Sequence, residues 1–266
     1  MSLQEKFRGA AAKRGFFIAR IVEKNDVTQL LGSLWPVETR FPLIRLGGPC
    51  DGGYLIPDDL AGITACFSPG VANIAQFEQD LVDRGIPCFL ADASVDAAPI
   101  AGPLVCFDKK FLDVWNSNDL VTLDTWVEQY APLESDLLLQ MDIEGAEWRV
   151  LLNASDKVLR RFRIIVVELH NMEKIAIDSM NSIVSSVLKR LLRDFYVVHA
   201  HPNNWVEPVL VRGIRIPRVI EITLLRKDRC PAIGPVRTLP HPLDRKNRPA
   251  RPDVALPAEL FPGAFP

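Results

Sequence analysis

The middle of the chain alternates short apolar runs with segments whose apolar residues recur at helical spacing, and this pattern constrains the fold most strongly. The runs are nearly continuous in Val, Ile, Leu and Phe, as strands are when both faces of a parallel sheet are covered. Five such runs lie at residues 63–68, 88–93, 104–107, 137–142 and 164–170. Helical patterns lie between or after them, at residues 73–84, 120–130, 146–152 and 180–191. The alternation predicts a doubly wound α/β fold.

Two further strand-like runs, residues 195–199 and 219–225, follow the last helical pattern. They are joined by a loop that contains His201 and Asn203 and carries no clear helical pattern. Two strands without a crossover helix are most simply antiparallel. We therefore expect a mostly parallel, Rossmann-like sheet of seven strands that ends in an antiparallel hairpin.

Three zones divide the chain. Residues 1–40 are predicted to be a helical N-terminal extension, with helix-like spacing at Phe7, Ala10 and Ala11 and again at 18–22. Residues 41–230 form the α/β domain. Residues 231–266 hold nine of the 21 prolines, a density that opposes regular helix or central strand and predicts an extended or disordered tail.

Composition excludes several classes of protein. A formal net charge of −2 argues against a dedicated nucleic-acid binder. No apolar run approaches the roughly 20 residues that a membrane span requires. The five cysteines show no C-x-x-C spacing, which fits free thiols in a reducing compartment. We expect a soluble, cytoplasmic protein.

Polar residues at the carboxyl ends of the predicted strands mark the expected ligand site, because open α/β sheets bind ligands there. The first strand ends in Ser68-Pro69-Gly70, where a glycine allows close approach of backbone to a ligand. Asp92 follows the second strand, about where such folds place an acid that accepts hydrogen bonds from a ribose. A nucleoside-containing cofactor would fit, and a simple tight turn with a solvated aspartate is the alternative.

The fourth and fifth strands end in acidic clusters. Asp142 and Glu144 follow the fourth strand, and Glu168 and His170 end the fifth. If these strands are neighbours, the four side chains converge in one cleft. Carboxylates beside a histidine can form a general base or hold a divalent metal ion, and the sequence does not decide between these roles.

At these residues the sequence resembles the FkbM family of S-adenosylmethionine-dependent methyltransferases. The most specific match is the segment Leu-Gln-Met-Asp-Ile-Glu-Gly-Ala-Glu-Trp at 139–148. Weaker matches are Asp-Gly-Gly-Tyr at 51–54, Phe-Ser-Pro-Gly at 67–70 with Phe-Glu at 77–78, Glu-Leu-His at 168–170 and His-Pro-Asn-Asn at 201–204. The resemblance covers about residues 43–226. Its glycine turn is reduced to Gly70, so contacts to the methionine end of the cofactor must come partly from elsewhere.

The resemblance implies a class I methyltransferase fold and transfer of a methyl group to a hydroxyl of a sugar, a glycan or a natural product. It assigns cofactor binding to residues before the first strand, at the strand ends and on the first helix, namely Asp51, Gly53, Tyr54, Ser68, Gly70, Glu78, Asp92 and Asp142. His170 is the leading candidate for the base, and Glu144, Asp142 and His201 are the further candidates for catalytic roles. A divalent metal ion is compatible with the acidic cluster, but the spacing does not establish one.

Three alternatives accompany this interpretation. A nicotinamide-dependent oxidoreductase would need a G-x-G-x-x-G turn, which is missing after the first strand. A metal-dependent hydrolase would use the cluster of Asp142, Glu144, Glu168 and His170. A non-catalytic binding module would fit the reduced glycine turn. The acceptor molecule and the oligomeric state are not predicted by the sequence.

Overall fold

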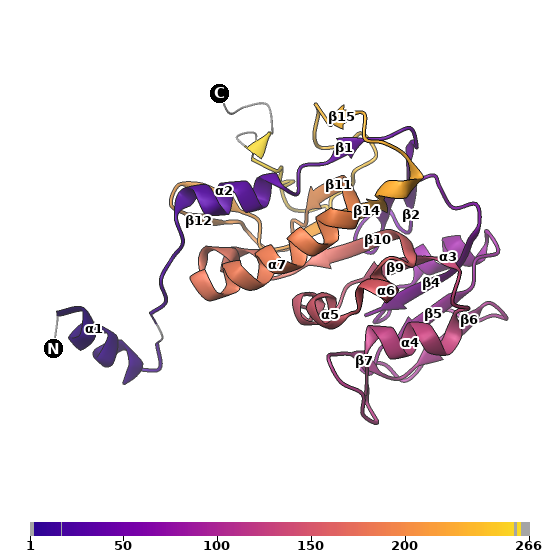
Figure 1. The fold of residues 1–266 in the computed structure, drawn as a ribbon, viewed down its shortest axis with the longest axis horizontal. Coiled ribbons are helices and arrows are strands. Elements are labelled where there is room, and N and C mark those ends of the chain that lie inside the picture. Colours follow the sequence, from indigo (N-terminus) through magenta and orange to yellow (C-terminus); the bar gives the residue numbers. More distant parts are fainter. Residues whose placement is uncertain (1–2, 17, 258–259, 262–266) are drawn as a thin grey trace.

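A seven-stranded sheet forms the centre of the computed structural model, which describes residues 3–16, 18–257 and 260–261 (Figure 1). The strand order is β11-β14-β10-β9-β4-β5-β6. The strands are β4 (Ile63–Pro69), β5 (Cys88–Ala91), β6 (Val105–Asp108), β9 (Asp136–Met141), β10 (Phe162–Leu169), β11 (Phe195–Pro202) and β14 (Ile220–Arg226). β14 runs antiparallel to both of its neighbours, and all other pairs in the sheet are parallel. The predicted mostly parallel, Rossmann-like sheet of seven strands with an antiparallel hairpin is confirmed.

Helices cover the sheet on both faces. They are α2 (Lys24–Gly32), α3 (Gln76–Val82), α4 (Leu123–Tyr130), α5 (Glu147–Asn153), α6 (Asp156–Leu159) and α7 (Asp178–Asp194), whereas α1 (Leu3–Ala12) lies away from the sheet. Successive residues of β10 point to opposite faces, so Ile165 and Val167 join the core cluster that includes residues of α2, α4, α5 and α7. Ile164 and Val166 join the second cluster, which includes residues of α3. Burial on both faces explains the unbroken apolar runs of the sequence.

Several short elements were not predicted. The hairpin of β2 (Leu43–Leu46) and β3 (Tyr54–Pro57) packs against the sheet on the side of α3. β7 (Phe111–Leu112) pairs with β8 (Leu120–Val121), and β12 (Val209–Val211) pairs with β13 (Ile214–Ile216) inside the expected loop. Strands of two to four residues are too short to show a period in the sequence.

Two predicted helical segments differ from the structure. Residues 18–22 are extended instead of helical, and Ile21 forms an isolated bridge with Ile177. The helix expected over 73–84 is shortened to α3, because the Ile74 N–H donates to the carbonyl of Val71 in a turn and Ala75, with a φ of −140°, has no helical conformation. A residue with that φ cannot belong to a right-handed helix.

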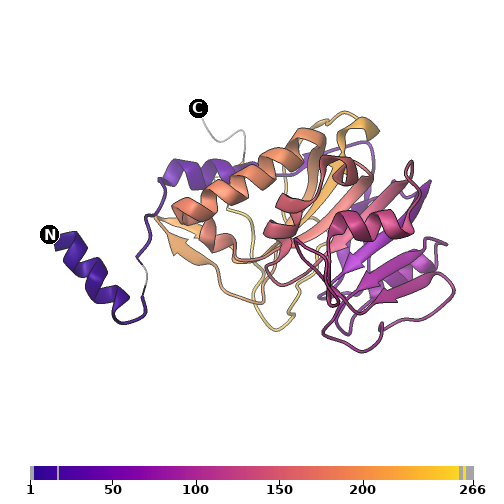
Figure 2. The ribbon, with the colours of Figure 1, turned by 60° about the horizontal axis from the view of Figure 1, so that its bottom comes forward.

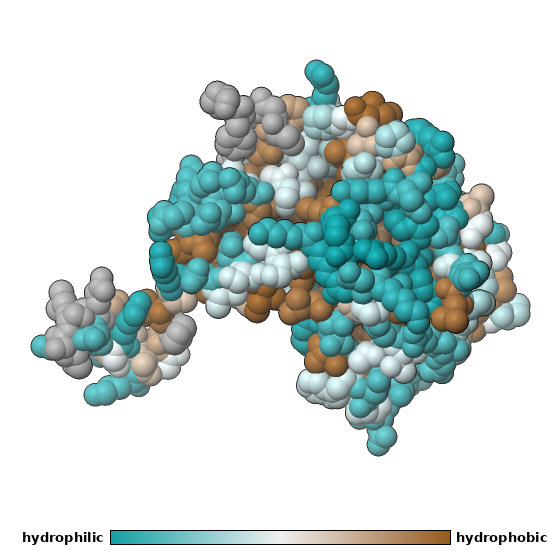
Figure 3. Space-filling model, in the orientation of Figure 1, coloured by the Kyte–Doolittle hydropathy of each residue, from teal (hydrophilic) through white to brown (hydrophobic). Residues whose placement is uncertain are grey.

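The chain ends lie apart from the centre of the sheet. α1 projects away from the rest of the molecule in both ribbon views (Figure 2). β1 (Val37–Glu38) pairs with β15 (Gly234–Pro235), and residues 236–257 follow through bends and turns without a helix or strand. This segment is tied to β11 by the 2.8 Å contact between His199 Nε2 and Asp244 Oδ1. No helix in the described residues is long and apolar enough to cross a membrane. Figure 3 shows a mainly hydrophilic surface over the helices of one face.

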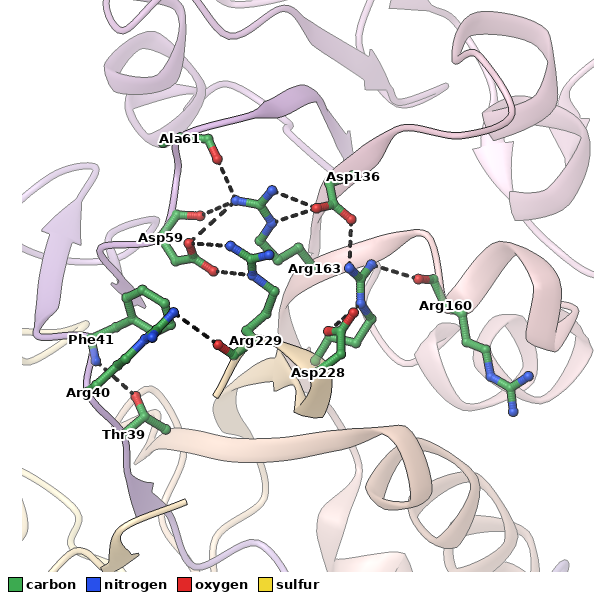
Figure 4. A network of polar contacts seen from close by, with 11 residues as sticks. Thr39, Arg40, Phe41, Asp59, Ala61, Asp136, Arg160, Arg163, Asp228 and Arg229 are labelled. Carbon is green, nitrogen blue, oxygen red and sulfur yellow. Dashed lines mark hydrogen bonds and ion pairs between the residues drawn. The ribbon is translucent and has the colours of Figure 1, made fainter. Parts of the chain in front are cut away.

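An ion-pair network connects the amino ends of β9 and β10 (Figure 4). Asp136 accepts hydrogen bonds from Arg163 at 2.6 and 2.9 Å and pairs with Arg226 at 2.7 Å. Arg163 and Arg229 both pair with Asp59, which links the network to the segment after β14. Burial alone raises the pKa of Asp136, but the two guanidinium groups outweigh it and hold the pKa below its usual value. The network lies at the opposite end of the strands from the cavity described next.

Candidate active site

A cavity of about 510 Å³ opens at the carboxyl ends of β4, β5 and β9, within the size range of small-molecule sites. The cavity lies at the carboxyl ends of the strands, the place where the sequence predicts the ligand site. The lining residues are Asp51, Gly52, Tyr54, Gly70, Val71, Ala72, Ile74, Phe77, Glu78, Ala91, Asp92, Ser94, Phe111, Leu112, Asp113, Leu120, Gln140, Asp142, Ile143, Glu144, Ala146 and Arg149. Asp92 and Asp142 therefore face one common cavity.

Gly70 brings the ends of β4 and β9 into direct contact. Its φ is +88°, and a Cβ added there would lie 1.6 Å from the carbonyl oxygen of Asp142. No side chain can occupy that space without separating the two strands. The glycine thus keeps bare backbone at the floor of the cavity.

Asp92 is oriented by three protein donors. Its Oδ2 accepts from the N–H of Ala72 at 2.8 Å, and its Oδ1 accepts from the N–H and hydroxyl of Ser94 at 2.8 and 2.6 Å. The side chain is 4% exposed and lines the cavity. Because a carboxylate offers about four acceptor sites, a lone pair remains for a ligand hydroxyl.

A buried hydrogen-bond chain supports another part of the cavity wall. Ser68 Oγ lies 2.5 Å from Glu78 Oε1 and 2.7 Å from Gln140 Oε1, and Gln140 Nε2 reaches the Tyr54 hydroxyl at 3.4 Å. Ser68 Oγ is the donor in both of its contacts, and burial raises the pKa of the Glu78 carboxyl that accepts one of them. Glu78, Gln140 and Tyr54 line the cavity, whereas Ser68 lies behind its wall.

The Asp51–Tyr54 turn reaches the rim of the same cavity. Asp51, Gly52 and Tyr54 line it, but Gly53 does not. A Cβ on Gly53 would lie 2.2 Å from the carbonyl oxygen of Gly48, so the lack of a side chain at Gly53 allows the turn to form. Gly53 is not part of the cavity wall.

The loop after β9 gathers acids around one imidazole. His170 Nδ1 lies 3.1 Å from Glu147 Oε1, and its Nε2 lies 3.8 Å from Asp142 Oδ1 and 3.6 Å from Glu144 Oε2. Glu147, the first residue of α5, is fully buried and also accepts from the N–H of Ile143 at 2.9 Å. Glu147 therefore orients both the histidine and the turn that carries Asp142.

Burial and charge set the protonation of this group. Burial raises the pKa of Asp142 to about 7, against the opposing charge of His170 and with the help of Glu144 and Glu147. Burial alone lowers the pKa of His170, but the hydrogen bond and charge of Glu147 and the neighbouring acids raise it to about 9. At neutral pH the imidazole is therefore positively charged, while Asp142 is divided between acid and carboxylate.

Three further residues that the sequence associated with this site do not line the cavity. His170 contacts the acids but is not in the wall of the cavity. The Glu168 side chain joins Asp51 and Glu221 in a separate group, whereas Asp142, Glu144 and His170 present ligand atoms within 4.8 Å of one another. His201 faces Asp253 of the C-terminal segment at 3.2 Å.

Part of the cavity wall was not predicted from the sequence. Phe111, Leu112 and Leu120 come from β7 and β8, and Arg149 of α5 pairs with Asp113 at 2.9 Å at the mouth of the cavity. The only feature of the sequence that could have indicated these residues is their place in the chain, directly after the carboxyl end of β6. No sequence motif distinguishes the segment.

Comparisons with known proteins bear on the identity of the domain. The family model described as methyltransferase FkbM domain matches residues 118–192. No match was found among curated proteins. Among solved structures, a fibrillarin/Nop5p complex is similar at 15% identity and a TM-score of 0.36, with 63% of this chain and 74% of that chain covered. A TehB-like SAM-dependent methyltransferase from Corynebacterium glutamicum is similar at 13% identity and a TM-score of 0.35, with 84% and 96% covered. Similarity of this degree transfers no residue role.

Proposed function

We propose that this protein is an S-adenosylmethionine-dependent methyltransferase of the FkbM family, whose domain model matches residues 118–192. We propose further that it methylates a hydroxyl oxygen of a sugar, a glycan or a natural product. One observation carries the proposal: Asp92, with a free acceptor position, and Asp142, with a pKa near neutrality, line the same cavity.

The residues around the cavity fit the cofactor. Asp92 would accept hydrogen bonds from the ribose hydroxyls, and the bare backbone at Gly70 leaves room beside it. Asp51, Tyr54 and Glu78 would line the methionine side, with Ser68 fixing Glu78 from behind. Gly53 would act indirectly, through the shape of the turn. When bound, S-adenosylmethionine supplies an activated methyl carbon.

Asp142 is the proposed base. It lines the cavity, and its pKa of about 7 leaves a substantial carboxylate fraction at neutral pH to accept the hydroxyl proton. His170, with a pKa of about 9, supplies positive charge beside that carboxylate instead of accepting the proton. Glu144, 88% exposed in its side chain, lies at the entrance on the acceptor side.

The proposal is tested by methyl transfer from radiolabelled S-adenosylmethionine to a panel of sugars, glycans and hydroxylated natural products. Asp142→Asn should lower the rate by about 10²–10⁴-fold, the usual contribution of a general base. Glu134→Gln, a change in an exposed acid before β9, is the matched control and should leave the rate unchanged. Equal rates in wild type and Asp142→Asn would remove Asp142 from this role, and incorporation only into amine or thiol acceptors would contradict O-methylation.

A further inference from the structure

A second group of buried acids lies beside the cavity, on the two antiparallel strands β10 and β14. Glu168 and Glu221 are directly opposite each other in the register of these strands. Their side chains are 4% and 5% exposed. Like charges at directly opposed positions of a sheet are destabilising, and burial removes the water that would screen them. The fold thus holds two acids where repulsion between them is strongest.

Asp51 completes the group from the β2–β3 turn. One carboxylate oxygen from each of Asp51, Glu168 and Glu221 lies within 4.8 Å of the other two. Asp51 also lines the cavity, so this acid group borders the candidate active site without sharing the Asp142 loop.

No basic side chain neutralises the group. Among the described residues, no lysine or arginine forms an ion pair with any of the three carboxylates. Arg45 lies near enough to Glu221 to interact with it electrostatically, but its Nε and Nη2 donate to the carbonyl oxygens of Gly48 and Cys50, each at 3.0 Å. Three neighbouring carboxylates therefore have only neutral hydrogen-bond donors.

Those donors leave two buried oxygens without a partner. Asn203 donates to Glu168 Oε1 at 2.6 Å, but Glu168 Oε2 accepts no hydrogen bond. Asn247, 4% exposed and contributed by the C-terminal segment, donates through Nδ2 to Asp51 Oδ1 at 3.1 Å and to Glu221 Oε1. Its own carbonyl oxygen, Oδ1, is also buried and lacks a donor. Oxygen atoms of this kind are unsatisfied unless a cation or water lies among them.

We propose that Asp51, Glu168 and Glu221 bind a hard divalent cation. Carboxylates are ligands of Ca²⁺, and Ca²⁺–O distances of about 2.3–2.6 Å allow ligand oxygens up to roughly 5 Å apart. Mg²⁺ holds its ligands closer, at about 2.0–2.1 Å, so Ca²⁺ is the better fit to three oxygens that lie within 4.8 Å of one another. The ion would join the β2–β3 turn and the sheet at one point beside the cavity.

The test uses the full-length protein after dialysis against EDTA. Calorimetric titration with CaCl₂, and in parallel with MgCl₂ and MnCl₂, should show one binding site, and thermal unfolding should shift upward with the ion present. Glu168→Gln and Glu221→Gln each remove one ligand charge and should weaken binding about tenfold or more. Both variants keep the carbonyl oxygen that Asn203 or Asn247 contacts, and far-ultraviolet circular dichroism without added ion checks that they fold.

Glu144→Gln is the control, because it removes an acid from the other group and should leave the affinity unchanged. Binding that is lost in Glu144→Gln but intact in Glu221→Gln would assign the ion to the Asp142 loop and overturn the proposal. Failure of all three ions to bind at about 10 mM, well above the dissociation constants of weak Ca²⁺ sites, would also overturn it. Neither result affects the proposed methyl transfer, which is measured separately.

Discussion

Replacing Asp136 by asparagine should destabilise the protein through the ion-pair network at the amino ends of β9 and β10. The substitution removes the charge that Arg163 and Arg226 share at 2.6 and 2.7 Å. The Arg163 side chain is 5% exposed, so it cannot regain its hydration in place of the lost partner.

The expected loss of unfolding free energy depends on the contacts that Arg163 keeps in the variant. Breaking a buried ion pair from one side costs about 3–5 kcal/mol. Arg163 keeps its contacts with Asp59 and with the carbonyl oxygen of Ala61 at 2.7 Å, and Asp136 is 24% exposed, so we expect about 2–4 kcal/mol. For a chain of this size that loss lowers the Tm by about 5–15 °C.

Thermal unfolding followed by circular dichroism at pH 7 is the assay. The control is Asp96→Asn, which removes an exposed pair with Lys109 and should leave the Tm nearly unchanged, as expected for a surface pair. Because the folded pKa of Asp136 is lowered, its contribution is complete above the unfolded pKa of about 3.9 and is lost as the pH falls through the folded value. The Tm difference between wild type and Asp136→Asn should therefore shrink below about pH 4. A shift at pH 7 no larger than that of Asp96→Asn would refute the reasoning.

Further predictions concern the cavity. Gly70→Ala should abolish measurable S-adenosylmethionine binding, because the added Cβ would overlap the backbone carbonyl of Asp142. Gly102→Ala is the control: nothing lies within 4 Å of its added Cβ, so it should bind the cofactor normally in the same calorimetric titration. The profile of kcat/KM against pH should rise through about 7 as Asp142 ionises and fall above about 9 as His170 loses its charge, and a profile flat from pH 6 to 10 would contradict both roles. His170→Gln should keep cofactor affinity and lose the alkaline limb.

The sheet could be predicted because its strands are buried on both faces. The apolar runs that became β4, β9 and β10 are long and unbroken, so the sequence marks them clearly. The position of β14 between β10 and β11 depends on tertiary pairing, and no local pattern encodes it. The β2–β3 and β12–β13 hairpins are too short to show a period.

The candidate site was predicted less completely than the fold. Strand ends indicated that Asp92 and Asp142 face one cavity, because parallel strands align their carboxyl ends. The direction of the side chains was harder to predict from the sequence than their place at the strand ends. Glu168 and His170 are two residues apart and were expected in one cleft, yet Glu168 lies opposite Glu221 and His170 lies beside Glu147. The chain leaves the strand after Leu169, so alternation no longer governs His170. Its raised pKa depends on acids from another loop, which spacing cannot reveal.

Binding of S-adenosylmethionine and S-adenosylhomocysteine to wild type and Asp92→Asn, measured by isothermal titration calorimetry, tests the central claim most directly. Loss of hydrogen bonds to a charged carboxylate costs about 1.5–3 kcal/mol, so Asp92→Asn should bind about 10- to 150-fold more weakly. Asp96→Asn, four residues farther on and exposed, should match wild type. No binding of either ligand to the wild-type protein, or equal affinity in Asp92→Asn, would contradict a cofactor site at the ends of β4, β5 and β9.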